Sequence, residues 1–215
     1  MEFAADIVFI VDSSSEVSRE NYNKEKGFIK SLAKTLNLSS GKTRASVIVY
    51  SGVASLEIRF NAYSNSTTFD KAVDDLPYLG SLRRMDLGLR EGAVAMKDAR
   101  PDVPKIVVLL TTGRQSQSSN LLPQAVKPLD ELGANIYVIA IGSQPSDREL
   151  RLVVKEPGDV LKVSRFDDLT PQTRPIARHI VNTTGKKTRF TGLVWPKGYI
   201  NRLLNLIMHI YCLFL

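Results

Sequence analysis

The stretch DIVFIVDSSSEVS (residues 6–18) decides the fold of this chain. Five apolar residues are followed by an aspartate, three serines and a glutamate. An uninterrupted run rich in Val and Ile, bounded by polar residues, is typical of a strand buried on both faces in a parallel sheet covered by helices. The polar cluster then lies at the carboxyl end of that strand, where open α/β sheets bind their ligands.

The rest of the chain alternates strand and helix patterns. The runs IVVLL (106–110) and IYVIAI (136–141) resemble the first strand, and apolar residues at helical spacing predict helices over 20–36 and 85–96. The alternation predicts a doubly wound α/β sheet with helices on both faces.

One part of this sheet is expected to be antiparallel. RASVIVYSG (44–52) and ASLEIRF (54–60) are separated by a tight turn, which predicts a hairpin. The sheet is therefore expected to have six mostly parallel strands with one antiparallel edge strand. The strands should begin near Asp6, Arg44, Ala54, Lys105, Asn135 and Val160.

Several residues predict where the later helices begin and end. SDRE (146–149) has the pattern of a capping box, and Pro171 suits the first turn of a helix. Pro128 lies further inside its helix and should shorten or kink it. Gly133 is the expected C-terminal stop of that helix.

Length and composition favour a single globular domain, which we place at residues 1–183. Hydrophobic residues make up 43% of the 215 residues and charged residues 24%, which excludes a disordered chain. We interpret the basic, then apolar, residues 184–215 as a tail outside the domain, with a surface-packed helix as an alternative. We expect no membrane association, because residues 203–215 are shorter than the ~20 residues that a spanning helix needs.

The net charge, the cysteine count and the N-terminal sequence limit the possible partners, disulfide bonds and targeting signals of the chain. The net charge of +7 permits an anionic partner, but no basic run is interleaved with aromatic residues, so we expect no nucleic acid partner. The single cysteine, Cys212, excludes an internal disulfide. We predict no signal peptide, and interpret the chain as a fragment or truncated product. Asn37, Asn65 and Asn182 begin Asn-x-Ser/Thr triplets near expected element ends and are candidate glycosylation sites.

The polar cluster after the first strand supports two interpretations from the residues alone. An aspartate followed by hydroxyl groups can bind Mg²⁺ or Mn²⁺. Alternatively, Asp12 and Ser14 cap the turn after the strand by bonding backbone amides.

Catalysis is not expected from this sequence. The two histidines, His179 and His209, are not expected near Ser14, and no Gly-x-Ser-x-Gly or phosphate-binding glycine loop occurs. A phosphoryl-transfer site built from Asp12, Glu16 and Asp86 is the less favoured enzymatic alternative, because it lacks a matched acid and base.

Four segments together resemble the von Willebrand factor type A domain, in the versions found in collagens and matrilins. They are DIVFIVDSSSEVS, SVIVYSG (46–52), RRMDLGLREG (83–92) and KIVVLLTTGRQS (105–116), and the resemblance covers residues 6–181. It implies a metal-ion-dependent adhesion site built from an Asp-x-Ser-x-Ser motif, a Thr before the third helix and an Asp after the fourth strand. In that family the metal accepts an acidic side chain from the partner.

The chain departs from that motif at three of its five positions. Asp12 and Ser14 match, but Glu16 replaces the second Ser, Arg83 falls at or next to the Thr position, and Thr112 replaces the Asp. Because Mg²⁺ demands near-ideal geometry, we predict a degenerate site that binds Mg²⁺ or Mn²⁺ weakly or not at all, and no other cofactor.

Arg83 has two interpretations. Its guanidinium could take the place of the ion and pair with Asp12 or Glu16. We favour the other interpretation, in which Arg83 and Arg84 are a solvated pair in a loop, because isolated surface charges are usually solvated.

The resemblance implies a non-enzymatic adhesion or protein-interaction module of an extracellular matrix or cell-surface protein, with matrix proteins such as collagen as partners. The expected partner surface comprises loops 13–18, 79–84 and 112–119, with Ser13, Ser15, Ser81 and Arg114 as contact residues. The alternative is a structural repeat unit of a larger matrix protein that contributes spacing and self-association without its own ligand.

Overall fold

The computed structural model describes residues 3–39, 41–118 and 120–191. The chain separates into two compact units, Met1–Val181 and Asn182–Leu215. The sheet and its site belong to the first unit. Most of the predicted tail lies outside the described residues, and the predicted domain boundary at residue 183 stays a prediction. Within the described ranges, no helix combines the length and apolarity needed to cross a membrane.

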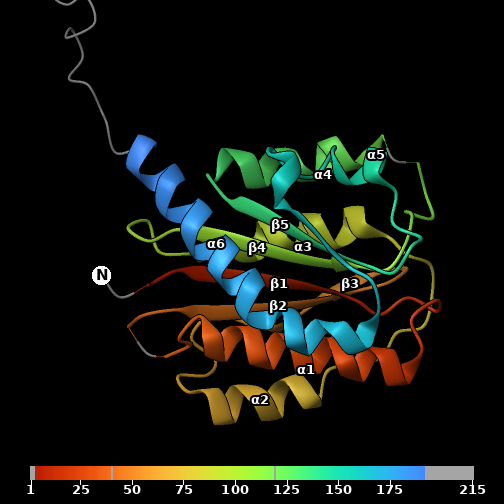
Figure 1. Ribbon diagram of the computed structural model, residues 1–215, viewed down its shortest axis with the longest axis horizontal. Coiled ribbons are helices and arrows are strands. Elements are labelled where there is room, and N and C mark those ends of the chain that lie inside the picture. The colour runs from red at the N-terminus through yellow and green to blue at the C-terminus, as the bar shows by residue number, and fades with distance from the viewer. Residues whose placement is uncertain (1–2, 40, 119, 192–215) are drawn as a thin grey trace, which may run out of the picture. The chain divides into compact units, whose positions relative to one another are not determined.

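The first unit contains one sheet of six strands in the order β3-β2-β1-β4-β5-β6 (Figure 1). All neighbouring strands are parallel except β2 and β3, which confirms the predicted fold class and the antiparallel edge. The strands are β1 (Asp6–Asp12), β2 (Arg44–Tyr50), β3 (Ala54–Ile58), β4 (Lys105–Thr111), β5 (Asn135–Ile141) and β6 (Val160–Val163).

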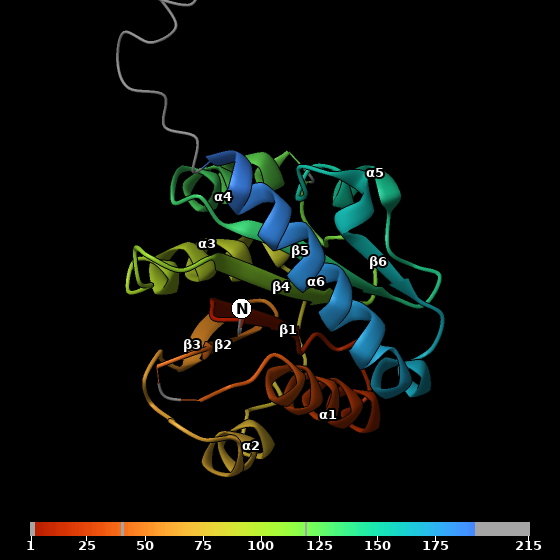
Figure 2. The same ribbon diagram turned by 60° about the vertical axis from the view of Figure 1, so that its left-hand side comes forward.

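Helices cover both faces of the sheet because the side chains of each strand alternate between two separate apolar cores (Figures 1 and 2). Ile7, Phe9 and Val11 of β1 pack in the core beneath α1, α2 and α6, whereas Val8 and Ile10 pack beneath α3, α4 and α5. The helices are α1 (Arg19–Thr35), α2 (Ser66–Asp74), α3 (Met85–Met96), α4 (Leu121–Glu131), α5 (Asp147–Leu150) and α6 (Leu169–Thr191).

Some predicted helix ends are confirmed and others are not. Gly133 adopts φ +74° directly after the C-cap of α4, as a left-handed stop requires. However, α4 continues through Pro128 to Glu131. The predicted capping box does not form, because Ser146 makes no side-chain cap bond to α5. The carboxylate of Glu149 instead accepts a hydrogen bond from the backbone of Gln115, at 3.0 Å.

Helix α2 was not predicted because only two of its residues, Phe69 and Val73, are buried. A single pair at i, i+4 is too short a pattern to read as an amphipathic helix. The local signal was its N-cap: Asn65 Oδ1 accepts from the amide of Thr68 at 3.0 Å.

The amino end of the sheet is held by a buried carboxylate. Asp6 begins β1, is fully shielded from solvent, and accepts hydrogen bonds from Arg44 Nε at 2.8 Å and Arg100 Nη2 at 2.8 Å. Burial alone would raise the pKa of Asp6, but the bonds from the two arginines outweigh it and hold that pKa below its ordinary value. This end of the sheet is therefore a structural anchor.

Candidate functional site

The carboxyl ends of β1 and β4 lie side by side at the point where the strand order reverses. Loops from distant parts of the chain meet there and are joined through their backbones. Ser15 N donates to Ser81 O, and Gly80 N donates to Ser13 O, both at 2.8 Å. Ser81 N donates to the hydroxyl of Ser51 at 2.8 Å. The loops therefore form one fixed rim above the sheet.

Asp12, the last residue of β1, lies beneath this rim and is fully buried. Its Oδ1 accepts from the backbone amide of Ser14 at 3.0 Å, which confirms the predicted turn cap by Asp12. The hydroxyl of Ser14, in contrast, has no hydrogen-bond partner among the described residues. Ser14 therefore contributes its backbone, and not its side chain, to the turn.

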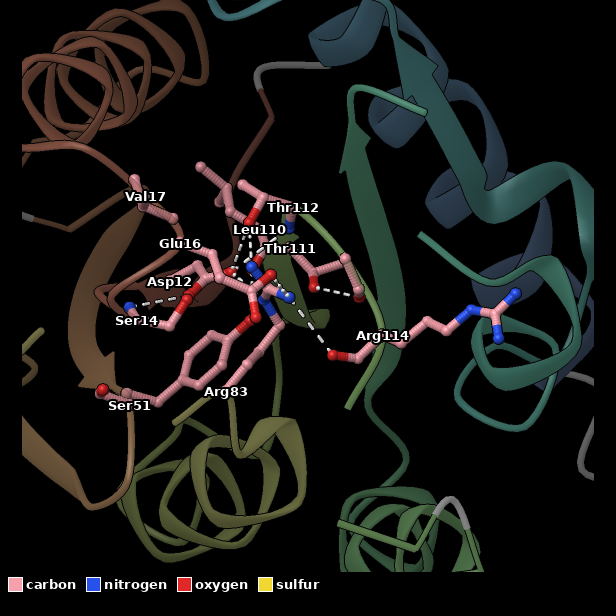
Figure 3. Close-up of polar contacts among 12 residues, drawn as sticks. Asp12, Ser14, Glu16, Val17, Ser51, Arg83, Leu110, Thr111, Thr112 and Arg114 are labelled. Atoms are coloured by element: carbon pink, nitrogen blue, oxygen red, sulfur yellow. Dashed lines mark hydrogen bonds and ion pairs between the residues drawn. The ribbon is translucent and has the colours of Figure 1, made fainter. Parts of the chain in front are cut away.

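The Arg83 guanidinium fills the space next to Asp12 (Figure 3). Its Nε lies 2.8 Å from Asp12 Oδ2, its Nη1 lies 2.9 Å from Glu16 Oε2, and its Nη2 lies 2.6 Å from Thr112 Oγ1. Arg83 is only 2% exposed. The favoured prediction of a solvated Arg83–Arg84 pair is thus wrong, because Arg83 is paired with the buried carboxylate of Asp12 and its other two guanidinium nitrogens also have acceptors. Arg84 is also paired, with Asp86.

Two neighbours fix Arg83 in this position. Ser116 holds its backbone from both sides: Arg83 N donates to Ser116 Oγ at 3.0 Å, and Ser116 N donates to Arg83 O at 2.9 Å. Gly113 leaves room for the guanidinium, since a Cβ at residue 113 would lie 2.3 Å from Arg83 Nη1. The loop after β4 therefore shapes the pocket that the guanidinium occupies.

Thr112 completes the charge arrangement. Its hydroxyl donates to Asp12 Oδ2 at 3.0 Å while accepting from Arg83 Nη2, and its backbone amide lies 3.3 Å from the same Asp12 oxygen. A carboxylate at this position would face Asp12 with a like charge and would need a cation between them. Threonine instead supplies a neutral donor, so the buried Arg83–Asp12 pair is balanced without an ion.

Two buried groups beneath the cluster were missed by the sequence analysis. Glu25 of α1 is fully buried, and neither carboxyl oxygen has a hydrogen-bond partner among the described residues. Burial, and next the negative charge of Asp12, raise the pKa of Glu25 well above its ordinary value. Burial and Asp12 raise the pKa of Tyr50 in the same way. The signal for Glu25 was its spacing, since it shares one helix face with Phe28, Ile29 and Leu32.

The residues as arranged do not fit a divalent cation. Asp12 Oδ2 already accepts a hydrogen bond from Arg83 Nε at 2.8 Å, and the positive charge of Arg83 would repel a divalent cation at the same carboxylate. Thr112 offers one neutral oxygen in place of a carboxylate. Among the described residues, no group of three or more His, Cys, Asp or Glu side chains could hold a metal ion.

The predicted partner surface is only partly exposed. Ser15, Ser81 and Arg114 are exposed, and Figure 3 shows the Arg114 side chain directed away from the Arg83 cluster. Ser13 is fully buried, and its hydroxyl accepts from the amide of Leu79 at 2.7 Å. Its prediction as a contact residue is therefore wrong, because the hydroxyl is used to hold the rim. Leu82 is 55% exposed on the same rim.

The three glycosylation candidates have different settings. Asn37 is exposed just after α1, and Asn65 is exposed but caps α2. Asn182 lies inside α6, so the expectation that it adjoins a loop or an element end is wrong.

The enzymatic alternative finds no support in the described residues. Ser14 Oγ has no base beside it. His179 instead contacts Tyr137 and lies 3.3 Å from Asp159 Oδ1. Asp86, the proposed third carboxylate, is bound to Arg84. Asp12 is fully buried and its carboxylate is paired with Arg83, so it is not exposed to a substrate.

The chain is similar in sequence to a known domain family and to proteins that contain it. The family model of the von Willebrand factor type A domain matches residues 6–174. Matrilin-1 of Gallus gallus is 28% identical over 158 residues, which cover 72% of this chain and 31% of matrilin-1. The collagen alpha-1(VI) chain of Gallus gallus is 28% identical over 156 residues, which cover 70% of this chain and 15% of the collagen chain. The chain therefore spans less than a third of either relative.

Solved structures share the fold. Proximal thread matrix protein 1 from the mussel byssus has a TM-score of 0.76 at 22% sequence identity, covering 82% of this chain and 48% of that chain. A second structure of the mussel protein, described as having a zinc-occupied MIDAS motif, has a TM-score of 0.75 at 21% identity. The match of the family model, the six-stranded sheet and these structures agree. This chain belongs to the von Willebrand factor type A domain family.

Proposed function

We propose that this chain is a non-enzymatic adhesion module of the matrix type, which binds a protein ligand through its sheet-end loops without a divalent cation. Its relatives, matrilin-1 and a collagen VI chain, are matrix proteins by name, which supports an extracellular setting with matrix proteins such as collagen as partners. In that setting, exposed Asn37 and Asn65 are the proposed glycosylation sites.

The observation that carries the metal-independent part of this proposal is the buried Arg83–Asp12 pair. A metal that bound to Asp12 would first have to displace the guanidinium and leave a buried charge unpaired. Breaking a buried pair in this way costs about 3–5 kcal/mol, which weakens metal binding by about two to four orders of magnitude. In this proposal the chain keeps the sheet-end loops of the family's adhesion site, and the Arg83 guanidinium supplies the positive charge that a metal ion would supply there.

The proposal is tested by replacing exposed rim serines with the larger side chain of arginine and measuring the binding of matrix proteins. Ser15→Arg and Ser81→Arg alter two exposed rim serines, and Ser64→Arg alters an exposed serine in the connection between β3 and α2 as a matched control. Binding to immobilised collagen VI and matrilin preparations is measured with and without EDTA. We expect the two rim variants to lose binding, the control to keep it, and EDTA to have no effect. Binding that survives both rim variants would place the contact elsewhere.

A structural repeat unit is the second candidate function. The small share of each relative that the chain spans supports it, because a module of that size can act as one part of a larger protein. This alternative predicts concentration-dependent self-association in sedimentation experiments and no binding to either matrix preparation.

A further inference from the structure

Resting on that proposed function, we infer that Glu16 is a displaceable internal ligand of Arg83, and that a carboxylate of an acidic partner segment takes its place on the guanidinium. The site would then recognise an acidic side chain by exchange of one carboxylate for another. The inference depends on how unequally the two acids around Arg83 are buried.

The two ion pairs of Arg83 differ in their exposure to solvent. The side chains of Arg83 and Asp12 are 2% and 0% exposed, so this pair stays in place under native conditions. The Glu16 side chain is 64% exposed and reaches Arg83 through Nη1 alone. An ion pair with one exposed, flexible partner contributes only about 0–1 kcal/mol, so Glu16 can leave Arg83 at little cost.

The other bonds of Arg83 remain when Glu16 leaves. Nε stays on Asp12, Nη2 stays on Thr112, and the backbone stays on Ser116. The guanidinium is thus held in position with Nη1 facing the place that Glu16 vacates. Its remaining acceptor there is the carbonyl of Arg114, at the longer distance of 3.3 Å. A preorganised donor of this kind is suited to bind a planar carboxylate.

Charge balance favours a carboxylate over other ligands. Arg83 and Asp12 neutralise each other, and Glu16 adds one negative charge to the cluster. A partner carboxylate that replaces Glu16 puts the same charge on Nη1, while the charge of the displaced Glu16 moves into solvent, where it is screened. A neutral amide would bind Nη1 without this charge-assisted bond and is expected to bind more weakly.

The exchange is tested with two peptides, N-acetyl-Gly-Glu-Gly-amide and its Gln counterpart. The ¹⁵N-labelled chain is titrated at low salt while the Nε–H resonance of Arg83 is followed by NMR. Glu16→Gln removes the competing charge at nearly constant size. Glu20→Gln removes an equal charge from the exposed first turn of α1, where Glu20 pairs with Lys24, and is the matched control.

We expect Glu16→Gln to bind the Glu peptide about two- to fivefold more tightly than the wild-type chain, from the loss of an exposed ion pair. Glu20→Gln should match the wild type, and the Gln peptide should bind more weakly than the Glu peptide to every chain. Equal affinities of Glu16→Gln and Glu20→Gln for the Glu peptide would overturn the inference, as would equal responses to the two peptides.

Arg83→Lys keeps the charge but removes the fork, and it should abolish binding of the Glu peptide. If this variant does not fold, Gly113→Ala provides the second test, because its added methyl group displaces Nη1 from the vacated place. Unchanged peptide affinity in a folded Arg83→Lys or Gly113→Ala chain would contradict carboxylate exchange.

Failure of the inference is distinguishable from failure of the proposed function. If the Glu peptide shifts the Arg83 resonance but no matrix preparation binds, then the adhesion function fails and the exchange stands. If the matrix preparations bind equally well to wild type, Glu16→Gln and Gly113→Ala, then adhesion stands and the exchange is wrong.

Discussion

Arg83 and Asp12 form an ion pair shielded from solvent, with Arg83 Nε 2.8 Å from Asp12 Oδ2, although the two residues are 71 positions apart in the chain. The pair joins the end of β1 to the loop before α3, so it contributes to the fold as well as to the site. In the proposed function, the same contact that keeps the loop in place also keeps a metal ion away from Asp12. The proposed metal independence therefore has the same physical origin as the stability of this loop.

Replacing Arg83 with methionine should destabilise the chain strongly. Arg83→Met leaves Asp12 buried without its cation, which costs about 3–5 kcal/mol. The control Arg90→Met alters an exposed arginine of α3 and should change stability by less than about 0.5 kcal/mol. Urea unfolding followed by circular dichroism measures both. Equal stabilities for the two variants would show that Arg83 is not a buried partner of Asp12.

Gly113→Ala should disturb the site through one methyl group. The new Cβ would lie 2.3 Å from Arg83 Nη1, so the guanidinium must move, at a cost of about 1–3 kcal/mol. Gly158→Ala is the matched control, because a Cβ at residue 158 meets no atom within 4 Å. Thermal unfolding of the two variants should separate them. A Gly113→Ala chain as stable as Gly158→Ala would contradict the close packing of Arg83 on this loop.

The fold was predictable because its signals are local and repeated. The buried runs at 7–11, 106–110 and 136–141 can be read without knowing their neighbours, and all six predicted strand starts agree with the structure. Helix α2 was not predicted because its two buried residues are too few to show the apolar spacing of an amphipathic helix. The predicted capping box of α5 did not form because the Glu149 carboxylate accepts a hydrogen bond from the backbone of Gln115, 34 positions away in the chain.

Glu25 should make stability depend on pH. Its pKa is raised in the folded chain, so the folded state holds this proton more tightly than the unfolded state. Stability from Glu25 is therefore full below the unfolded pKa of about 4.3 and declines as pH rises toward the folded value. Glu25→Met should remove this decline. Between the unfolded and folded pKa values of Glu25, the unfolding free energy of the variant should rise relative to that of the wild type by about 1.4 kcal/mol per pH unit.

Unfolding free energies of wild type and Glu25→Met between pH 4 and 8 measure this difference. Glu20→Met, at an exposed position of the same helix, should run parallel to wild type. A constant difference between wild type and Glu25→Met at all pH values would contradict a raised pKa for Glu25.

Asp6 should act in the opposite direction. Its pKa is lowered in the folded chain, so its contribution is present above the unfolded pKa of about 3.9 and is lost as pH falls through the folded value. Asp6→Asn should be less stable than wild type at pH 7, with the difference shrinking below about pH 4. Acid titration of stability checks this prediction, and a difference that widens on acidification would refute it.

The site was less predictable than the fold because it depends on where one long side chain points. Asp12, Glu16, Arg83 and Thr112 could all be identified from the motif, but the motif does not show whether Arg83 faces solvent or Asp12. That choice is made by Ser116 and by the missing side chain of Gly113, both contributed by the loop after β4. The expectation that Arg83 is solvated was wrong because it applies to charged side chains that have no buried partner.

The most direct test of the account is a calorimetric titration of the chain with Mg²⁺ and Mn²⁺. The triple variant E16S/R83T/T112D, which rebuilds the motif of the metal-ion-dependent adhesion site, serves as the positive control. The wild-type chain is expected to bind neither ion more tightly than about 1 mM, or about 4 kcal/mol, while the triple variant is expected to bind at least one of them. Saturable binding of one ion to the wild-type chain well below that concentration would contradict the claim that Arg83 stands in for the metal.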